Sequence, residues 1–359
     1  MSGARARAES VDVLVLGGGV VGAAAAAAAA RGDRSVALLE RFGLEAARGS
    51  SKGTARIFCP AAYPEDEYLE MGLRAVDGWR RVEAETGEKL LHETGVVSVG
   101  EFAERQLPAL RAAGEPAERI GADEALARFS ITLDDRRPII HQPGAGVVAA
   151  DRARAALLSV AVRAGVSLRE RETAIAIEDR GDRVSVATDR GCWECETALV
   201  AAGPWSRPLL AEAGIDLPVT VSLQSVAYLE LAQPARSPAA LIDFDGDEPY
   251  ALWDPARGLK AAFHARGPAA DPDDELRESA DEVARIGEWA AARYPGIAGP
   301  VVASEPCLYT NTADERFLVE RHGRVVAVSA CSGHGFQFAP ETGRRAAALA
   351  AEALGASVA

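Results

Sequence analysis

Cysteine is scarce in this chain, with five residues in 359. An odd number spread this thinly does not form the paired framework of a disulfide-rich secreted domain. Cys192 and Cys195 form a C-x-x-C pair, which is also found in redox and zinc sites. No second pair completes a zinc site, and the segment is typical of a β-hairpin strand that follows the turn "TDRG". We therefore predict a structural role for the pair, no metal site and a cytoplasmic protein.

A dense run of basic residues is also missing, and 53 acidic residues outweigh 39 basic ones to give a net charge of −14. This balance excludes a general affinity for nucleic acid or for anionic lipid. The opening "MSGARARAES" carries arginines, but the apolar core of a signal peptide does not follow it directly. Residues 13–30 have the apolar length of a membrane span. Because glycines break their first half and alanine is only weakly hydrophobic, we interpret them as a soluble strand–helix unit.

No repeat of 20–50 residues is visible, and the chain is too long for one ordinary core, so we expect two domains. Periodicity predicts helices at residues 65–86, over the charged stretch 101–130, and around 273–293. Asp151 is the expected N-cap of another helix, which ends at Gly165. Antiparallel strands are expected at 173–203, 219–231 and 258–265, on both sides of a proline-rich region at 234–249. A closing strand, loop and helix occupy 324–354.

The first apolar segment carries a nucleotide-binding pattern. Gly17, Gly19 and Gly22 fit G-x-G-x-x-G: the first permits a tight turn, the second lets the backbone approach a pyrophosphate, and the third lets helix and strand pack closely. The free N–H groups at the start of the following helix attract the anion. Glu40 ends the second strand, about 20 residues further on, where a carboxylate binds ribose hydroxyls. An acid there disfavours a 2′-phosphate, so FAD or NAD is indicated over NADP.

Five further motifs occur in a fixed order: "GSSKGTARI" (49–57), "LVAAGPWSRPLL" (199–210), "GLKAAFH" (258–264), "PCLYTNTADERFLVE" (306–320) and "CSGHGFQF" (331–338). With them the chain resembles the monomeric sarcosine oxidase and N-methyltryptophan oxidase family, within the D-amino-acid-oxidase-like flavoproteins. The resemblance covers nearly the whole chain, without the family's C-terminal tail. It implies bound FAD, oxidation of the C–N bond of a secondary amine or amino acid to an imine, and transfer of the electrons to O2 to give hydrogen peroxide.

The resemblance also implies roles for individual residues. Cys307 corresponds to the cysteine that holds the family's flavin through a thioether; otherwise it is a small buried hydrophobe. Lys260 matches the oxygen-activating lysine, and a fixed cation there would stabilise negative charge developing on oxygen. The residues expected around the substrate are His264, Tyr309, His334 and Tyr250. Those expected around the cofactor, besides the glycines and Glu40, are Arg41, Ser51, Lys52, Thr54, Arg56, Gly203, Trp205, Gly333, Gly335, Phe336 and Gln337.

Two positions depart from the family pattern. Members that take small amino acids hold the carboxylate with an arginine three residues after the Arg56 equivalent and a lysine three residues after the equivalent of His334. Here those positions are Cys59 and Gln337. An arginine and a lysine are strong partners for a carboxylate. Their loss predicts that sarcosine is a poor substrate, and that the amine has its carboxylate absent, masked or placed elsewhere.

The expected fold is α/β with α+β insertions. A Rossmann-like FAD-binding domain takes residues 1–85, 145–215 and 300–359, and an interleaved substrate domain with an antiparallel sheet takes 86–144 and 216–299. The main function hypothesis is a monomeric amine oxidase that acts on a small molecule with O2. Two alternatives stay open: a flavin dehydrogenase with another electron acceptor, and a flavin-binding protein without oxidase activity. NAD-dependent hydride transfer leaves "SGHGFQF" and Cys307 without a role.

Overall fold

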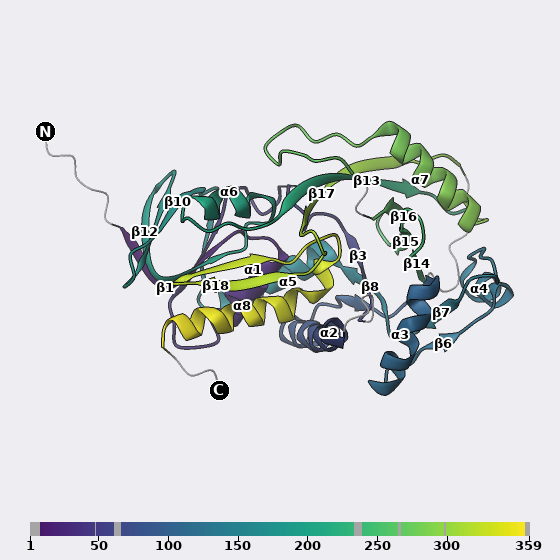
Figure 1. Ribbon diagram of the computed structural model, residues 1–359, viewed down its shortest axis with the longest axis horizontal. Coiled ribbons are helices and arrows are strands. Elements are labelled where there is room, and N and C mark those ends of the chain that lie inside the picture. The colour runs from purple at the N-terminus through teal and green to yellow at the C-terminus, as the bar shows by residue number, and fades with distance from the viewer. Residues whose placement is uncertain are drawn as a thin grey trace, which may run out of the picture.

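The computed structural model describes residues 8–46, 48–60, 66–232, 239–264, 267–297 and 299–355. These residues form an elongated molecule with one large sheet toward each end (Figure 1). Three helices, α1, α5 and α8, gather at the first sheet, whereas α3, α4 and α7 lie at the second (Figure 1). None of the described helices is long and apolar enough to cross a membrane.

The first sheet has a parallel centre. Its order is β10-β11-β12-β1-β2-β9, and β19 pairs with β12 and with β18. Its strands are β1 (Glu9–Leu16), β2 (Val36–Glu40), β9 (Ser167–Glu170), β10 (Ala174–Asp179), β11 (Val184–Thr188), β12 (Gly191–Val200), β18 (Leu318–His322) and β19 (Val325–Ser329). β1 runs parallel to both β2 and β12, whereas β10, β11 and β12 form the predicted antiparallel meander. The apolar runs of β1 and β2 fit strands covered on both faces.

The second sheet is almost entirely antiparallel, in the order β17-β13-β16-β15-β14-β5-β7-β6. Its strands are β5 (Val96–Val99), β6 (Glu118–Arg119), β7 (Ile139–Gln142), β13 (Thr220–Leu229), β14 (Ala240–Asp243), β15 (Pro249–Asp254), β16 (Gly258–Phe263) and β17 (Ala303–Asn311). A small third sheet joins β3 (Ala55–Phe58), β8 (Gly146–Ala149) and β4 (Leu91–His92). β17 pairs with β13 although residues 300–359 are predicted for the first domain, and the division into domains stays a prediction.

The helices follow most of the predicted positions. They are α1 (Val20–Ala29), α2 (Asp66–Thr86), α3 (Glu101–Ala112), α4 (Ala122–Phe129), α5 (Ala150–Arg163), α6 (Ser206–Ala211), α7 (Ala280–Arg293) and α8 (Ala339–Ala353), with 3₁₀ turns η1 (Gly203–Trp205) and η2 (Gly335–Phe338). Glu65 and residues 234–238 and 265 of the predicted segments lie outside the described residues.

Three helix boundaries differ from the predictions. Asp151 is not an N-cap: β8 runs directly into α5, and the amide of Ala150 donates to the carbonyl of Thr54, so the capping contact comes from a distant segment. The stretch 101–130 is two helices, because Gly114 adopts a positive φ of 77° after α3. α7 begins only after Ser279, whose side chain accepts from the amide of Glu282.

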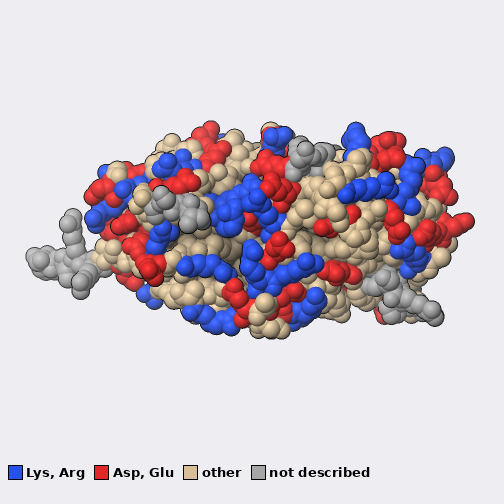
Figure 2. All heavy atoms as spheres, turned by 90° about the horizontal axis from the view of Figure 1, so that it is seen from below, with Lys and Arg blue, Asp and Glu red and all other residues tan. Residues whose placement is uncertain are grey.

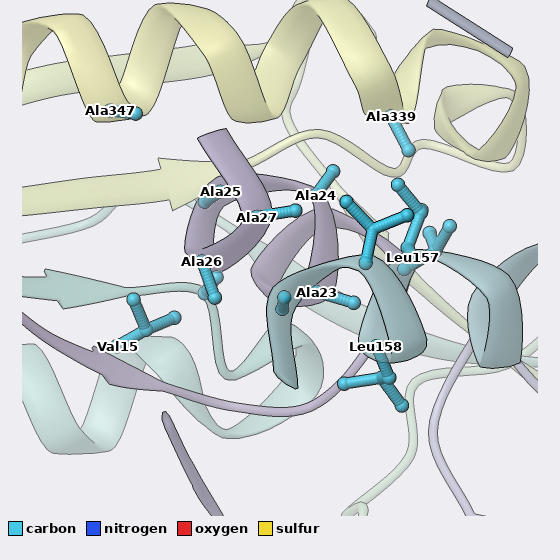
Figure 3. Close-up of a cluster of buried hydrophobic side chains, with 14 of the residues drawn as sticks. Val15, Ala23, Ala24, Ala25, Ala26, Ala27, Leu157, Leu158, Ala339 and Ala347 are labelled. Carbon is cyan, nitrogen blue, oxygen red and sulfur yellow. The ribbon is translucent and has the colours of Figure 1, made fainter. Parts of the chain in front are cut away.

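The alanine run that resembled a membrane span is the centre of the first core. In α1, Ala23 to Ala27 are almost completely buried, and they lie between Ala339 and Ala347 of α8 and Leu157 and Leu158 of α5 (Figure 3). Small side chains allow this close approach: a Cβ added at Gly343 of α8 would lie 2.6 Å from the backbone of Ala24. The interpretation of this segment as a strand–helix unit is therefore correct.

The C-x-x-C pair lies in β12, as predicted, and both thiols are free. Cys195 is buried opposite Val184 of β11, and Cys192 lies within 3.3 Å of the hydroxyl of Ser185. Each cysteine thus packs against a residue of the neighbouring strand β11. At the surface, acidic and basic side chains are interspersed over the face that carries α2 and α8 (Figure 2).

Candidate active site

The larger cavity, of about 690 Å³, lies where the ends of β1 and β2 meet β17 and the loop after β19. Most of the residues that the sequence assigns to a cofactor line it. They are Gly17, Gly19, Glu40, Arg41, Ser51, Lys52, Arg56, Gly203, Trp205, Cys307, Gly333, Gly335 and Phe336. Gly22, Thr54 and Gln337 do not line it: Gly22 packs behind the turn, and the hydroxyl of Thr54 donates to the buried carboxylate of Asp254.

The glycine turn after β1 leaves no room for side chains. Gly17 has φ 107°, and a Cβ there would lie 2.5 Å from the carbonyl oxygen of Ala201. A Cβ at Gly22 would overlap the carbonyl of Gly17. The structure thereby agrees with two of the roles expected from the pattern, which are a tight turn and close packing of α1 on β1.

The start of α1 is open toward the cavity. Its N-cap is Gly19, which has no side chain of its own to cap the helix, and the amide of Val20 donates to the Ser51 hydroxyl at 3.0 Å. Among the described residues, the buried Nε of Arg48 in the same lining has no hydrogen-bond partner. Helix N-termini and unpaired donors attract anions. The turn, the helix start and this donor therefore fit the pyrophosphate of a dinucleotide.

Glu40 is held beside the turn by two backbone amides. Its carboxylate accepts from Gly18 at 2.7 Å and from Phe42 at 2.8 Å, so its position at the end of β2 is fixed. This places a carboxylate where a ribose would lie. Farther along the same wall, Arg41 pairs with Asp273 at 2.8 Å, and the indole nitrogen of Trp205 donates to the same carboxylate.

One face of the second sheet covers the opposite side of the cavity. Val226 of β13 pairs with Ala262 of β16 and with Glu305 of β17, and alternate residues of these strands share that face. On it lie the cavity-lining residues Cys307, Tyr309, Lys260 and Tyr250. The period-2 spacing of 307 and 309 explains why both side chains reach the cavity.

Lys260 is a buried cation in this face. It is 3% exposed, and its Nζ donates to the carbonyl of Ala55 at 3.1 Å. Burial, and then the neighbouring Arg56, lower the pKa of Lys260 from its ordinary value to about 7. Near neutral pH the ammonium form of Lys260 is therefore held only weakly.

Arg56 is fixed beside it by backbone carbonyls. Its guanidinium donates to Ala55, Ser50 and Lys52 at 2.9, 3.1 and 2.5 Å, and its Cζ lies 5.8 Å from the centre of the Phe336 ring. A cation held this way cannot swing out of the wall. Together with Lys260 it makes one end of the cavity positive.

A second cavity, of about 350 Å³, adjoins this positive end. Arg56, Tyr250, Lys260, Gly333 and Phe336 line both cavities. The second also contains the predicted substrate residues His264 and His334. Tyr309 lines only the larger cavity but hydrogen-bonds to Tyr250 and lies 5.7 Å from the His264 ring. A Cβ at Gly333 would overlap the Tyr309 ring, so only glycine fits at this junction.

His334 is neutral. Burial lowers its pKa to about 3, and its ring stacks on Phe317 at 4.7 Å between centroids. Its Nε2 lies 3.0 Å from the carbonyl oxygen of Glu315, which can only accept, so Nε2 carries the proton. Nδ1 is then the acceptor nitrogen of the ring.

The two residues that depart from the family pattern meet in this second cavity. The side-chain oxygen of Gln337 accepts from the backbone amide of Cys59 at 2.6 Å, and both residues are buried and line the cavity. Neither carries a charge. The two positions at which the family pattern predicts cations thus hold a hydrogen-bonded pair without charge.

Sequence reasoning missed several lining residues. In the larger cavity these include Arg48, Ser50, Arg154 and Cys331. In the second cavity they include Phe102 and Arg105 of α3 and Phe244, whose ring lies 4.3 Å from that of Phe102. The residues from α3 belong to an ordinary amphipathic pattern, so no local signal distinguishes them. Ser50 and Cys331 stand inside quoted motifs, next to residues that were assigned.

The packing at Gly22 gives a direct test of the cofactor cavity. Gly22→Ala forces Cβ into the Gly17 carbonyl, and overpacking of this kind costs about 1–3 kcal/mol. We expect a lower melting temperature and a lower flavin-to-protein absorbance ratio. Gly32→Ala is the matched control, since a Cβ there meets nothing within 4 Å. Equal flavin content in the two variants would contradict the assignment.

Known proteins are similar to this chain in sequence and in fold. The FAD-dependent oxidoreductase model DAO matches residues 12–349. The chain is 30% identical to monomeric sarcosine oxidase of Streptomyces avermitilis, with 94% of this chain and 93% of that protein covered. It is 29% identical to peroxisomal sarcosine oxidase of Mus musculus, with 94% and 92% covered. NikD, an unusual amino acid oxidase essential for nikkomycin biosynthesis, has a similar structure in the open form of its Tyr258Phe mutant: the TM-score is 0.87, the identity 25%, and 96% and 94% of the chains are covered. The chain therefore belongs to the DAO family of FAD-dependent oxidoreductases.

Proposed function

We propose that this protein is an FAD-dependent oxidase that converts a secondary, N-methyl or cyclic amine into an imine and reduces O2 to hydrogen peroxide. The observation that carries the proposal is Lys260, a buried cation on the wall shared by the two cavities. One cavity has the features of a dinucleotide site, and the other has the size and lining of a small-molecule site. The names of the relatives, sarcosine oxidase and amino acid oxidase, support the same chemistry.

The larger cavity fits FAD. The glycine turn and the start of α1 would hold the pyrophosphate, and Glu40 would hold a ribose. Arg56, Phe336 and Lys260 line the end that opens to the second cavity, and they would surround the flavin ring. When bound, FAD would accept two electrons from the amine and pass them on to O2.

The protein's residues supply position and charge. The amine loses two electrons and two protons as its C–N bond becomes C=N, and O2 gains the same number to become hydrogen peroxide. Lys260, in its ammonium form, stabilises the negative charge that develops on oxygen. Neutral His334 and the Tyr250–Tyr309 pair hold the substrate without adding charge. Water then hydrolyses the imine, or the imine cyclises where the substrate allows.

Four further properties belong to the proposal. We propose that the flavin is attached to Cys307 by a thioether, because Cys307 faces the larger cavity from β17. We also propose a monomer, by analogy with the monomeric sarcosine oxidases, and a cytoplasmic location. The division into a discontinuous FAD-binding domain and an interleaved substrate domain is likewise proposed.

Sarcosine is expected to be a poor substrate. The neutral Cys59–Gln337 pair offers a bare carboxylate neither an arginine nor a lysine, and losing two such partners lowers binding on the order of 10²-fold or more. Anaerobic flavin bleaching by a panel of amines, followed by peroxide release in air, measures both the ranking and the reaction. Turnover of sarcosine or proline as fast as any larger amine contradicts the prediction.

The same panel tests the function itself. Bleaching by an amine followed by fast peroxide formation is the expected result. Bleaching followed by slow reoxidation in air, with rapid turnover of an artificial acceptor, would make the protein a dehydrogenase. If no amine bleached the flavin, the enzymatic proposal would fall.

A further inference from the structure

Gln337 is fixed at two points. Its backbone carbonyl accepts from the indole nitrogen of Trp79 at 2.8 Å, and Trp79 is completely buried in α2. Its side-chain oxygen accepts from the amide of Cys59 at 2.6 Å. The residue lies in η2 and is 8% exposed. Both ends are therefore held by partners about 260 to 280 positions away in the sequence.

The contact with Cys59 decides which way the carboxamide faces. A backbone N–H can only donate, so the atom that it meets is the carbonyl oxygen, and the NH2 group lies on the other side. Within the described part of the chain, this NH2 group has no hydrogen bond, and Gln337 lines the second cavity. Gln337 is thus a buried residue that lines the second cavity and holds a carboxamide whose donor is unused, so the donor is available to a bound ligand.

The surrounding charges favour a neutral partner for this donor. The second cavity is lined by three carboxylates, those of Glu101, Asp245 and Glu248. Its cations are Arg105, Lys260 and Arg56, of which the last two also line the larger cavity. Arg105 is an exposed residue of α3, and it lies one helical turn from Glu101, which is also exposed. No cation is therefore placed beside Gln337 by the contacts of the described residues.

We propose that Gln337 is a specificity-determining residue, whose NH2 group donates to an uncharged carbonyl oxygen on the substrate. The substrate class is then an amine that carries an amide or ester in place of a free carboxylate. This inference rests on the proposed amine oxidation and deepens it. Cys59 contributes through its backbone, which orients the glutamine.

Binding of analogues that cannot be oxidised tests the inference apart from turnover. (Methylthio)acetamide, (methylthio)acetate and methyl propyl sulfide carry sulfur in place of the amine nitrogen, and they differ only in the acceptor group. Calorimetry with the FAD-loaded protein is expected to show the amide binding about 10-fold more tightly than the carboxylate. Gln337→Glu keeps the oxygen that Cys59 binds but removes the donor. It should weaken binding of the amide about 10-fold and leave binding of methyl propyl sulfide, which has no acceptor group, unchanged.

Gln337→Lys is the second variant. It restores a cation, so this variant should bind the carboxylate more tightly than the amide. A gain of affinity for the carboxylate cannot be caused by misfolding. The inference is overturned if the wild-type protein binds the carboxylate as tightly as the amide, if the amide does not bind, or if neither variant changes the ratio. Flavin bleaching by amines is measured separately. If binding of the amide depended on Gln337 but no amine bleached the flavin, the proposed oxidation would be wrong. The inference that Gln337 recognises an amide or ester would still hold.

Discussion

Replacing Lys260 by methionine is expected to slow the reaction of the reduced protein with O2 by about 10²–10³-fold, which is the usual effect of removing one preorganised charge-stabilising group. Methionine keeps the length and apolar stem of the side chain, so the packing in β16 is retained. Flavin bleaching by the amine should change much less, because Lys260 acts on the charge that forms on oxygen. Stopped-flow measurement of the two half-reactions separates these effects.

The pH dependence of the wild-type protein follows from the same residue. Burial and the nearby Arg56 lower the pKa of Lys260 to about 7, so the ammonium form is present below pH 7 and is lost as the pH rises above it. The rate constant with O2 should therefore be highest below pH 7 and fall above it. Lys260→Arg keeps a cation that does not deprotonate in this range, and the fall should disappear in that variant.

Lys89→Met is the matched control. Lys89 is exposed and lies outside both cavity linings, at 3.6 Å from Glu83, so its loss changes the net charge without touching the site. It should react with O2 like the wild-type protein. An unchanged O2 rate in Lys260→Met would remove the main support for an oxidase and favour the dehydrogenase alternative.

Local chemistry explains which parts of this protein can be predicted from its sequence. The glycine turn and Glu40 lie within one strand–turn–helix–strand unit, and each role depends on neighbours in that unit. The prediction at Asp151 was wrong for the opposite reason. The contact that starts α5 comes from Thr54, about 100 positions away, and no local pattern contains it.

The second cavity is another example, because its contacts also join residues that are far apart in the sequence. The order of the motifs marked Cys59 and Gln337 as two separate departures from a family pattern. Their hydrogen bond joins residues 278 positions apart, so the sequence does not reveal it. The structure shows that the two uncharged residues form one unit, in which the Cys59 amide fixes the orientation of the Gln337 carboxamide. Phe102 and Arg105 of α3 reach the cavity only through the packing of the second sheet, so they carry no motif at all.

Among the described residues, Cys307 and Cys331 line the larger cavity, and their surroundings differ. Cys307 is 8% exposed in β17, and its thiol interacts electrostatically with the fixed guanidinium of Arg56. The thiolate is the nucleophilic form of a cysteine. Burial instead raises the pKa of Cys331, whose sulfur accepts from the amide of Thr310 at 3.4 Å. Cys307 is therefore the better candidate for the thioether, and O2 supplies the two-electron oxidation that forming its C–S bond requires.

Cys307→Ser is expected to abolish the covalent attachment of the flavin completely. A serine hydroxyl fills the same space in β17 but does not form the thioether, so the cofactor is held only by the contacts of the larger cavity. After acid precipitation, the wild-type protein should give a yellow pellet, and the variant a colourless pellet under a yellow supernatant. Cys331→Ser is the matched control, because it removes the other thiol that lines the cavity and should keep the colour in the pellet. A colourless wild-type pellet would refute the linkage. A yellow Cys307→Ser pellet together with a colourless Cys331→Ser pellet would move the attachment to Cys331, even though burial disfavours its thiolate.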